Sequence, residues 1–289
     1  MSGTGELRVY KDAIVIMTGG ASGIGRALGE ALGRRGAHVI LADLQKDVAE
    51  EVAGGIRSRG GKADAVHLDT RDFAAVENLV NETAKTHGRL DYMFNNAGIA
   101  VGGEVRYYSI DDWNYIYDVN LRGVTNGVQA AYPIMLRQGF GHIVNTASMA
   151  GLTPTPFIVG YGTTKHAVVG LSLSLRVEAA EAGIRVSALC PGFLRTNIIK
   201  GGGKYGRVVQ DVSEEVQDKL AEKTRPADVN AFAVSALRAL ARNRAIVVYP
   251  WWYRIIWGLH RLSPAIGLFL AAQTFAATRK EVGPPPPPG

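Results

Sequence analysis

The sequence has almost no cysteine, since Cys190 is the only one in 289 residues. A disulfide within the chain is therefore excluded, which favours a reducing compartment. The six histidines are scattered and form no pair at metal-ligand spacing, so we expect no metal site. The first apolar run, residues 13–17, follows a polar start and is too short for a secretion signal. We therefore expect a cytoplasmic protein.

Long apolar runs and an excess of charge are also absent from most of the chain. Residues 262–277 form a run of 16 that contains a proline, whereas a membrane-spanning helix needs about 20 residues. Residues 1–237 hold 25 basic and 25 acidic side chains, so the net charge of +6 comes from the seven basic residues and one acid that follow. A nucleic-acid-binding protein would carry basic residues over a whole face. We do not expect a nucleic-acid partner.

Short β-branched runs alternate with stretches of helical period along the chain. Strands that are nearly continuously apolar and separated by helices are typical of a parallel sheet covered on both faces. We therefore predict an α/β fold: a doubly wound (Rossmann-type), mostly parallel seven-stranded sheet with helices on both faces. The runs that predict its strands are residues 13–19, 38–43, 64–69, 90–98, 141–148, 184–192 and 244–250.

The same pattern suggests how the chain is divided. We expect a dinucleotide-binding catalytic domain over residues 1–250, with a substrate loop at about 193–225. Residues 251–283 are apolar and basic, with helical period, and form a C-terminal extension. Residues 284–289 are rich in proline and are expected to be disordered.

A glycine-rich turn, "TGGASGIG" at residues 18–25, follows the first predicted strand and opens a helix. Gly19, Gly23 and Gly25 let the backbone turn tightly, and a diphosphate can then approach the amides of the helix N-terminus. The spacing is G-x-x-x-G-x-G, which alone is also compatible with a plain strand–helix turn. Its place in the first strand–helix unit favours a dinucleotide site.

An acid ends the second predicted strand, 18 residues beyond Gly25. The carboxylate of Asp43 can accept hydrogen bonds from both adenosine ribose hydroxyls and would repel a 2′-phosphate. Leu44 and Gln45 follow it directly, without a basic residue. The sequence therefore predicts NAD(H), and not NADP(H), as cofactor.

Tyr161 and Lys165 lie four residues apart in "YGTTK", so they share one face of a helix. A phenol has a pKa of about 10 and is a poor base at neutral pH. A neighbouring ammonium favours the phenolate, and a shift of roughly 3 units needs about 4 kcal/mol. The pair is common by chance on solvated helices, so its meaning depends on its neighbours.

Further motifs accompany this pair. Ser148 ends the fifth predicted strand thirteen residues before Tyr161, and Asn120 lies inside a long predicted helix. "NNAG" (residues 95–98) ends the fourth strand, and "PGFLRT" (residues 191–196) follows the sixth. In this order, over residues 8–250, the motifs resemble the short-chain dehydrogenase/reductase family in its compact form.

The resemblance implies a role for each matched residue. Tyr161 would be the proton donor or acceptor, Lys165 would lower its pKa and hold the nicotinamide ribose, and Ser148 would hydrogen-bond the substrate oxygen. Asn120 would complete a proton relay through water. The residues implied in cofactor binding are Gly19, Ser22, Gly23, Ile24, Gly25, Asp43, Leu44, Asp69, Thr70, Asn96, Ala97, Gly98, Tyr161, Lys165, Pro191, Gly192, Phe193 and Thr196.

Some of these positions allow a purely structural interpretation. Asp69 and Thr70 end the third predicted strand and would reach the adenine, but an acid there is equally typical of a strand-end turn. We interpret Cys190 as a core thiol and His166 as a structural residue. The resemblance also implies a homodimer or homotetramer.

Oxidation of an alcohol removes a hydroxyl proton and a carbon-bound hydride, for which a base and a nicotinamide suffice without a metal. We therefore expect an NAD(H)-dependent oxidoreductase that interconverts a hydrophobic secondary alcohol and its ketone, with Tyr161 as general acid/base. One alternative is a 3-oxoacyl or other carbonyl reductase that uses NADPH. An alternative of another class is an inactive nucleotide-sensing or scaffold protein, which would have no need of all four catalytic residues.

The least regular segments should select the substrate. Residues 149–159 are apolar apart from threonines, and residues 193–220 contain a helix that Ser213 could cap. Arg195 and Lys200 are candidates to clamp an anionic substrate, although both are more typical of surface charges. We therefore expect a small apolar alcohol or ketone.

The C-terminal extension contains "PWWYRIIWGLH" at residues 250–260 and an apolar stripe of helical period that Pro264 interrupts. Three interpretations are open. The stripe packs on the domain or on a sister subunit, it lies on an anionic membrane surface as an interfacial helix, or it covers an apolar substrate as a lid. The residues of the stripe are Trp252, Ile255, Ile256, Leu259, Leu262, Ile266, Phe269 and Leu270.

Overall fold

The computed structural model describes residues 6–196, 198 and 204–283. Its main sheet has seven strands in the order β3-β2-β1-β4-β6-β7-β9, and every neighbouring pair is parallel. The predicted seven-stranded parallel sheet is therefore confirmed. Its strands are β1 (Ile14–Thr18), β2 (His38–Asp43), β3 (Lys62–His67), β4 (Tyr92–Asn95), β6 (Gly141–Thr146), β7 (Ile184–Pro191) and β9 (Ile246–Tyr249).

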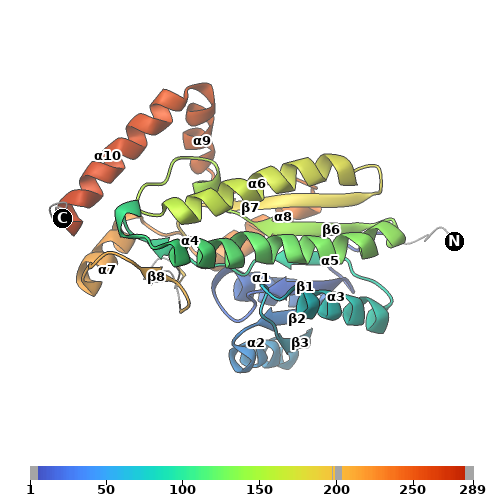
Figure 1. The fold of residues 1–289 in the computed structure, drawn as a ribbon. Coiled ribbons are helices and arrows are strands. Elements are labelled where there is room, and N and C mark those ends of the chain that lie inside the picture. Colours follow the sequence, from blue (N-terminus) through green and yellow to red (C-terminus); the bar gives the residue numbers. More distant parts are fainter. Residues whose placement is uncertain (1–5, 197, 199–203, 284–289) are drawn as a thin grey trace.

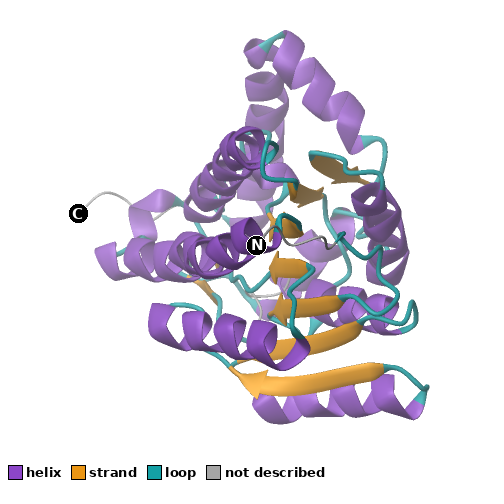
Figure 2. Cartoon of the chain, turned by 90° about the vertical axis from the view of Figure 1, so that its right-hand side faces the viewer, coloured by secondary structure: helices purple, strands orange, loops and turns teal. Residues whose placement is uncertain are grey.

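Helices connect the strands and cover both faces of the sheet (Figures 1 and 2). The helices before the last strand are α1 (Gly23–Gly33), α2 (Lys46–Ser58), α3 (Phe73–His87), α4 (Ile110–Tyr117), α5 (Gly123–Gln138), α6 (Val159–Ala179), α7 (Glu214–Lys223) and α8 (Val229–Ala241). Two more helices, α9 (Tyr253–Leu262) and α10 (Pro264–Val282), follow it. Ser213 caps α7 by accepting a hydrogen bond from the Val216 amide, as expected.

The core lies in two layers, one on each face of the sheet. On one face, α1, α2 and α8 pack on β1 and β2 through side chains such as Leu28, Val52 and Phe232. On the other, α3, α5 and α6 pack through residues such as Val80 and Met135. The middle strands are buried on both faces, which is why they read as nearly continuous apolar runs.

The register of the parallel strands brings their carboxyl ends to one edge. Thr18 at the end of β1 pairs with Ala42 on β2, and Asn95 at the end of β4 pairs with Asn145 on β6. Loops that leave this edge therefore meet, whatever their separation in sequence.

The structure differs from the prediction in local details. The third strand is Lys62–His67, so Asp69 and Thr70 belong to the following loop and do not end the strand. A second sheet pairs β5 (Val101–Gly102) with β8 (Arg207–Val208). Strands of two residues are too short to leave a period in the sequence.

The C-terminal extension forms a bent pair of helices. Figure 1 shows α9 standing on the body and α10 running back at an angle toward α7. The interpretation that the apolar stripe packs on its own domain is wrong, because all eight residues of the stripe are exposed. The side chains that α9 turns inward are instead Tyr253 and Trp257. Within the described residues, no helix has the length and apolarity that crossing a membrane requires.

Candidate active site

A cavity of about 850 Å³ opens along the carboxyl edge of the main sheet. It runs from the glycine turn after β1, past the ends of β4 and β6, to the loop after β7 and the helix α10. Of the residues predicted from the sequence to bind cofactor or to act in catalysis, all line this cavity except Gly25 and Asn120. Residues from six separate segments of the chain therefore meet at one site.

The turn after β1 leaves space that side chains would fill. Gly19 and Gly23 have φ values of +66° and +51°, a region that favours glycine. A Cβ on Gly25 would lie 2.0 Å from the Gly19 carbonyl oxygen, and one on Gly19 would lie 2.9 Å from the Ala97 Cα. The turn can therefore adopt this shape only with glycine at these positions, and Ser22 then begins α1 at the cavity wall.

Asp43 is held in place by the backbone of two turns. Its carboxylate accepts hydrogen bonds from the Ala21 amide at 3.0 Å and the Gln45 amide at 2.9 Å. Lys204, from the loop before β8, reaches the same end of the cavity and donates to the Gln45 side chain at 2.8 Å. The sequence analysis missed this lysine, because it lies 159 residues from Gln45 along the chain.

Asp69 forms an ion pair in the loop after β3. Its carboxylate accepts from the Arg71 guanidinium at 2.6 Å and from the Arg71 amide at 3.0 Å. These hydrogen bonds lower the pKa of Asp69. The residue thus has the structural role of a strand-end turn acid while it also lines the cavity.

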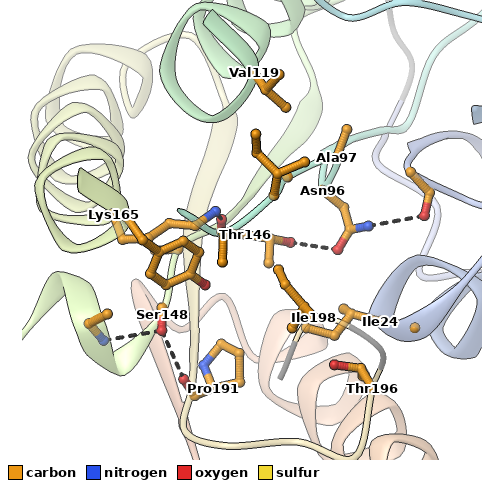
Figure 3. A pocket seen from close by; sticks show the side chains of 18 of the residues that line it. Ile24, Asn96, Ala97, Val119, Thr146, Ser148, Lys165, Pro191, Thr196 and Ile198 are labelled. Atoms are coloured by element: carbon orange, nitrogen blue, oxygen red, sulfur yellow. Dashed lines mark hydrogen bonds between the residues drawn. The ribbon is translucent and has the colours of Figure 1, made fainter. Parts of the chain in front are cut away.

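Asn96 connects three strand ends (Figure 3). Its amide nitrogen donates to the Thr18 carbonyl at 3.0 Å, and its oxygen accepts from the Thr146 hydroxyl at 3.1 Å. The side chain therefore holds the ends of β1, β4 and β6 in register beside Ala97 and Gly98. Both polar atoms of its side-chain amide are used in hydrogen bonds that hold these strand ends together. The backbone of this loop therefore remains to face the cavity.

Three of the four predicted catalytic residues come together at the wall formed by β6, β7 and α6 (Figure 3). Lys165 is buried and donates to the Thr146 carbonyl at 2.8 Å, with its Nζ 5.3 Å from the centre of the Tyr161 ring. The Ser148 hydroxyl accepts from the Ala150 amide at 3.1 Å and lies 3.5 Å from the Pro191 carbonyl. Tyr161, Lys165 and Ser148 therefore share one wall of the cavity.

Burial acts against the charge of both members of the Tyr161–Lys165 pair. It raises the pKa of Tyr161 to about 12, which the hydrogen bond with Ser148 offsets only in part. It lowers the pKa of Lys165 to about 8. The expectation that Lys165 holds the pKa of Tyr161 below its usual value is not met by the protein groups alone, because burial raises this pKa by more than the hydrogen bond with Ser148 lowers it.

Asn120 lies in a π-helical segment, Asp118–Arg122, that joins α4 to α5. The side chain is fully buried, accepts from the Ile99 amide at 2.8 Å and donates to the Ile99 carbonyl at 2.9 Å. It therefore ties the helix to the loop after β4. The long helix predicted around Asn120 is present, but it widens at this residue, as helices often do at functional sites.

Several lining residues carried no signal in the sequence. Tyr115 and Val119 reach the cavity from α4 and the π-helical segment, and Tyr253, Ala271 and Thr274 reach it from α9 and α10. The apolar segment at residues 149–159 lines the cavity as expected, whereas Lys200 lies outside the described residues. The extension therefore borders the cavity, as its interpretation as a lid requires, and only the packing of distant segments could identify which of its residues do so.

The comparisons with known proteins agree with this arrangement. A model of the short chain dehydrogenase family matches residues 13–204. Meso-2,3-butanediol dehydrogenase of Serratia marcescens is 36% identical over 214 residues, which are 74% of this chain and 80% of that protein. Oxidoreductase UcpA of Salmonella typhimurium is 38% identical over 182 residues, 63% of this chain and 69% of that protein.

Solved structures show the same fold. A short chain dehydrogenase/reductase of Burkholderia phymatum, in complex with NAD, has a TM-score of 0.76 at 28% identity and covers 98% of this chain and 99% of its own. Levodione reductase has a TM-score of 0.74 at 30% identity over 83% of this chain and 96% of its own. The chain belongs to the short chain dehydrogenase family of oxidoreductases.

Proposed function

We propose that this protein uses NAD(H) to interconvert a hydrophobic secondary alcohol and its ketone. The observation that carries the proposal is the convergence of Ser148, Tyr161 and Lys165 on one wall of a cavity whose other end is the glycine turn after β1. The relatives support this class of reaction, since one is named a butanediol dehydrogenase and another a levodione reductase.

The shape of the cavity fits a dinucleotide. Gly19, Gly23 and Gly98 line it, and a Cβ on Gly98 would come within 3.2 Å of the Asn120 oxygen and 3.5 Å of the Lys165 Nζ. The missing side chains leave room for a ligand to lie against the backbone. Asp43 at one end would hold the adenosine ribose, and Lys165 at the other would hold the nicotinamide ribose.

The protein groups would divide the proton chemistry between them. The nicotinamide, when bound, supplies the hydride acceptor or donor. Tyr161 accepts the hydroxyl proton during oxidation and returns it during reduction, and Ser148 hydrogen-bonds the substrate oxygen. The Lys165 ammonium, buried beside the Tyr161 ring, stabilises the phenolate that forms. Asn120 keeps the π-helical segment against this wall, next to Gly98.

The distribution of charge around the cavity supports an apolar substrate. Of the described lining residues, Asp43, Asp69, Arg71, Lys165 and Lys204 are the charged ones. Lys165 alone is part of the catalytic wall, and its Nζ is already hydrogen-bonded to the Thr146 carbonyl. The segment at residues 149–159 supplies methionine, proline and isoleucine side chains. No described residue there would bind a carboxylate or phosphate of the substrate.

One observation favours the alternative of an NADPH-dependent carbonyl reductase. The Lys204 ammonium lies beside Gln45, two residues after Asp43, where it could attract a 2′-phosphate. Asp43 would repel the same phosphate, and its carboxylate is held by two amides, whereas the lysine is on an exposed loop. We therefore favour NAD(H). The variant Lys204→Ala distinguishes the two cofactors. If the lysine binds the 2′-phosphate, the variant has a lower kcat/KM with NADP⁺ and an unchanged kcat/KM with NAD⁺.

The direct test is oxidation of a panel of apolar secondary alcohols, with NAD⁺ and NADP⁺ in parallel. We expect turnover with NAD⁺ and a loss of at least about 100-fold in kcat for Tyr161→Phe, since the loss of a general acid/base costs 10²–10⁴. Binding of NAD⁺ by the variant, measured by calorimetry, should be retained, because the other residues implied in cofactor binding are unchanged. Turnover that survives in Tyr161→Phe would disprove the assigned base.

A further inference from the structure

The two C-terminal helices expose an unusual amount of apolar surface. Large side chains are exposed on both, up to 82% at Leu262 and 62% at Phe269. We call this surface the α9–α10 face. It consists of Trp251, Trp252, Ile255, Ile256, Leu259, Leu262, Ile266, Leu268, Phe269 and Leu270. An apolar patch that spans two successive helices marks an interaction site.

The helix α10 has little contact with its own chain. It carries no charged residue from Pro264 to Thr278, and Gly267 is its one buried residue. A helix that is apolar all round needs an apolar environment on more than one side. Its far end is attached: Phe275 stacks on Phe157 at 4.9 Å, and Glu281 binds Lys219 at 2.7 Å. The helix is thus held at its C-terminal end, while the large apolar side chains of its first half are exposed.

Positive charge lies on the side of α9 away from its exposed apolar residues Trp252, Ile255, Ile256 and Leu259. Arg254 and Arg261 are exposed and seven residues apart, so they occupy the same side of α9. Among the described residues neither has an ion pair, and Arg261 lies over the Trp257 ring at 5.5 Å. Glu281 is the one acid after position 237, and it is bound to Lys219 and Lys223. The helix α9 therefore has the two faces of an interfacial helix, with exposed apolar side chains on one side and arginines without acids on the other.

This combination favours an anionic lipid surface over a second copy of the chain. A second copy of the two helices would offer only its own arginines and no free acid, so it could not compensate the unpaired Arg254 and Arg261. Anionic lipid headgroups supply that compensation, and tryptophan rings and arginine side chains suit the boundary between headgroups and acyl chains. Neither helix is both long enough and apolar enough to cross the bilayer, so the two helices would lie on it.

We propose that the α9–α10 face docks the protein on an anionic membrane surface, and that an apolar substrate enters the cavity beside α10. The second half of this proposal rests on the proposed function. It follows from the position of α10, because Ala271 and Thr274 on the same helix line the cavity that holds Tyr161. A molecule dissolved in the acyl chains would reach the cavity without crossing bulk water.

The docking is tested with the full-length protein by co-sedimentation with vesicles, in the absence of substrate. We expect binding to vesicles of equimolar phosphatidylglycerol and phosphatidylcholine, weakened by salt, and at least about tenfold weaker binding to pure phosphatidylcholine. The double variant Leu262→Asp with Phe269→Asp should bind the mixed vesicles at least about tenfold more weakly. The matched control is Val177→Asp, on α6, because this residue is 76% exposed and lies outside the face; it should bind like the wild type.

Each other outcome overturns the docking. Wild-type protein that stays in the supernatant, or a double variant that binds as well as Val177→Asp, excludes the α9–α10 face as a lipid contact. If the wild type does not sediment and the double variant has a smaller mass in solution, the face is a contact between copies. Equal melting temperatures of the two variants show that the aspartates have not unfolded the chain.

The route of entry is read separately, from kcat/KM for a long-chain and a short water-soluble secondary alcohol. In the wild type, mixed vesicles should raise kcat/KM for the long-chain alcohol several-fold relative to kcat/KM for the short-chain alcohol. In the double variant they should not. If both alcohols respond equally, entry beside α10 is wrong. If neither alcohol is oxidised, the proposed function fails, whereas sedimentation still decides the docking.

Discussion

At the scale of single residues, burial and charge act against each other in the catalytic pair. A phenolate and an ammonium both lose hydration in this cavity wall, which raises the pKa of Tyr161 and lowers that of Lys165. A proton on Tyr161 and a weakly held proton on Lys165 are therefore the resting state. This state suits a group that must both give and take a proton in a reversible reaction.

The pH dependence follows from these directions. In the proposed mechanism alcohol oxidation needs deprotonated Tyr161, and because its pKa is raised to about 12 the deprotonated fraction grows as pH rises. We expect kcat for oxidation to increase from neutral to alkaline pH. The increase should fall below tenfold per pH unit once Lys165, whose pKa is about 8, loses its charge. Ketone reduction needs the protonated form and should stay level or fall.

Steady-state rates in both directions, at saturating cofactor, measure these two profiles. Tyr108→Phe is the control, because burial also raises the pKa of this phenol to about 12 but Tyr108 does not line the cavity. An oxidation rate that is highest in acid would contradict the assignment of Tyr161 as the base.

Asp43 allows a second test at this scale. Asp43→Asn keeps an oxygen for the Ala21 amide but removes the charge that would repel a 2′-phosphate. We expect kcat/KM with NAD⁺ to fall about 10- to 100-fold, since a hydrogen bond to a charged group contributes roughly 1.5–3 kcal/mol. The value with NADP⁺ should not fall. Asp47→Asn removes an exposed acid nearby and should alter neither; a parallel loss with both cofactors in Asp43→Asn would refute the ribose assignment.

At the scale of elements, α10 connects the cavity to the substrate loop. Its last turn binds α7 through Glu281, whose pKa is lowered to about 2 by the hydrogen bonds with Lys219 and Lys223. Arg279 of the same turn lies 3.5 Å from the Glu104 carboxylate, which follows β5. The helix therefore bridges two segments that are far apart in sequence and that both belong to the surroundings of the cavity.

We expect Glu281→Gln to loosen this bridge. KM for a bulky alcohol should rise about two- to threefold with kcat nearly unchanged, a modest effect because an exposed ion pair is weak. Limited proteolysis should also cut the segment between β7 and α7 faster. Glu82→Gln removes a comparable exposed pair with Lys85 on α3 and serves as the control. Identical kinetics and cleavage in the two variants would show that Glu281 does not restrain the loop.

At the scale of the whole molecule, a buried carboxylate joins the first strands to the N-terminal segment. Asp91, just before β4, is fully buried and accepts from the Ile14 amide at 2.9 Å and the Arg8 amide at 3.1 Å. It also accepts from the Arg89 guanidinium at 2.8 Å. One side chain thus satisfies donors from three segments, on the edge of the sheet opposite the cavity.

Asp91→Ala should therefore destabilise the protein without touching the site. Leaving Arg89 and two amides without their partner should lower the free energy of unfolding by about 3 kcal/mol. Urea unfolding followed by circular dichroism measures this, and activity in the absence of urea should remain near the wild-type value. Asp72→Ala, which removes only the exposed N-cap of α3, should cost about 1 kcal/mol. A smaller loss for Asp91→Ala than for Asp72→Ala would contradict this account.

The local order of residues was enough to predict the sheet and most of the cavity. The seven strands, the glycine turn, Asp43 and the Tyr161–Lys165 pair depend on periodicity and on neighbours within a few residues. Parallel strands then place their carboxyl ends on one edge, so Ser148 and Asn96 could be assigned to the same site without coordinates. The family resemblance named the same residues.

Contacts across long separations decided the rest. The stacking of Phe157 on Phe275 and the approach of Lys204 to Gln45 join residues more than a hundred positions apart, and no local pattern records them. The exposure of the apolar stripe is equally non-local, because a helix of the same sequence could pack inward or outward. The pKa directions of Tyr161 and Lys165 also depend on how completely the surrounding chain excludes water. The sequence by itself therefore determined the sheet and the order of residues along its carboxyl edge, because these depend on local patterns, and the tertiary structure decided what surrounds the site and which surface faces outward.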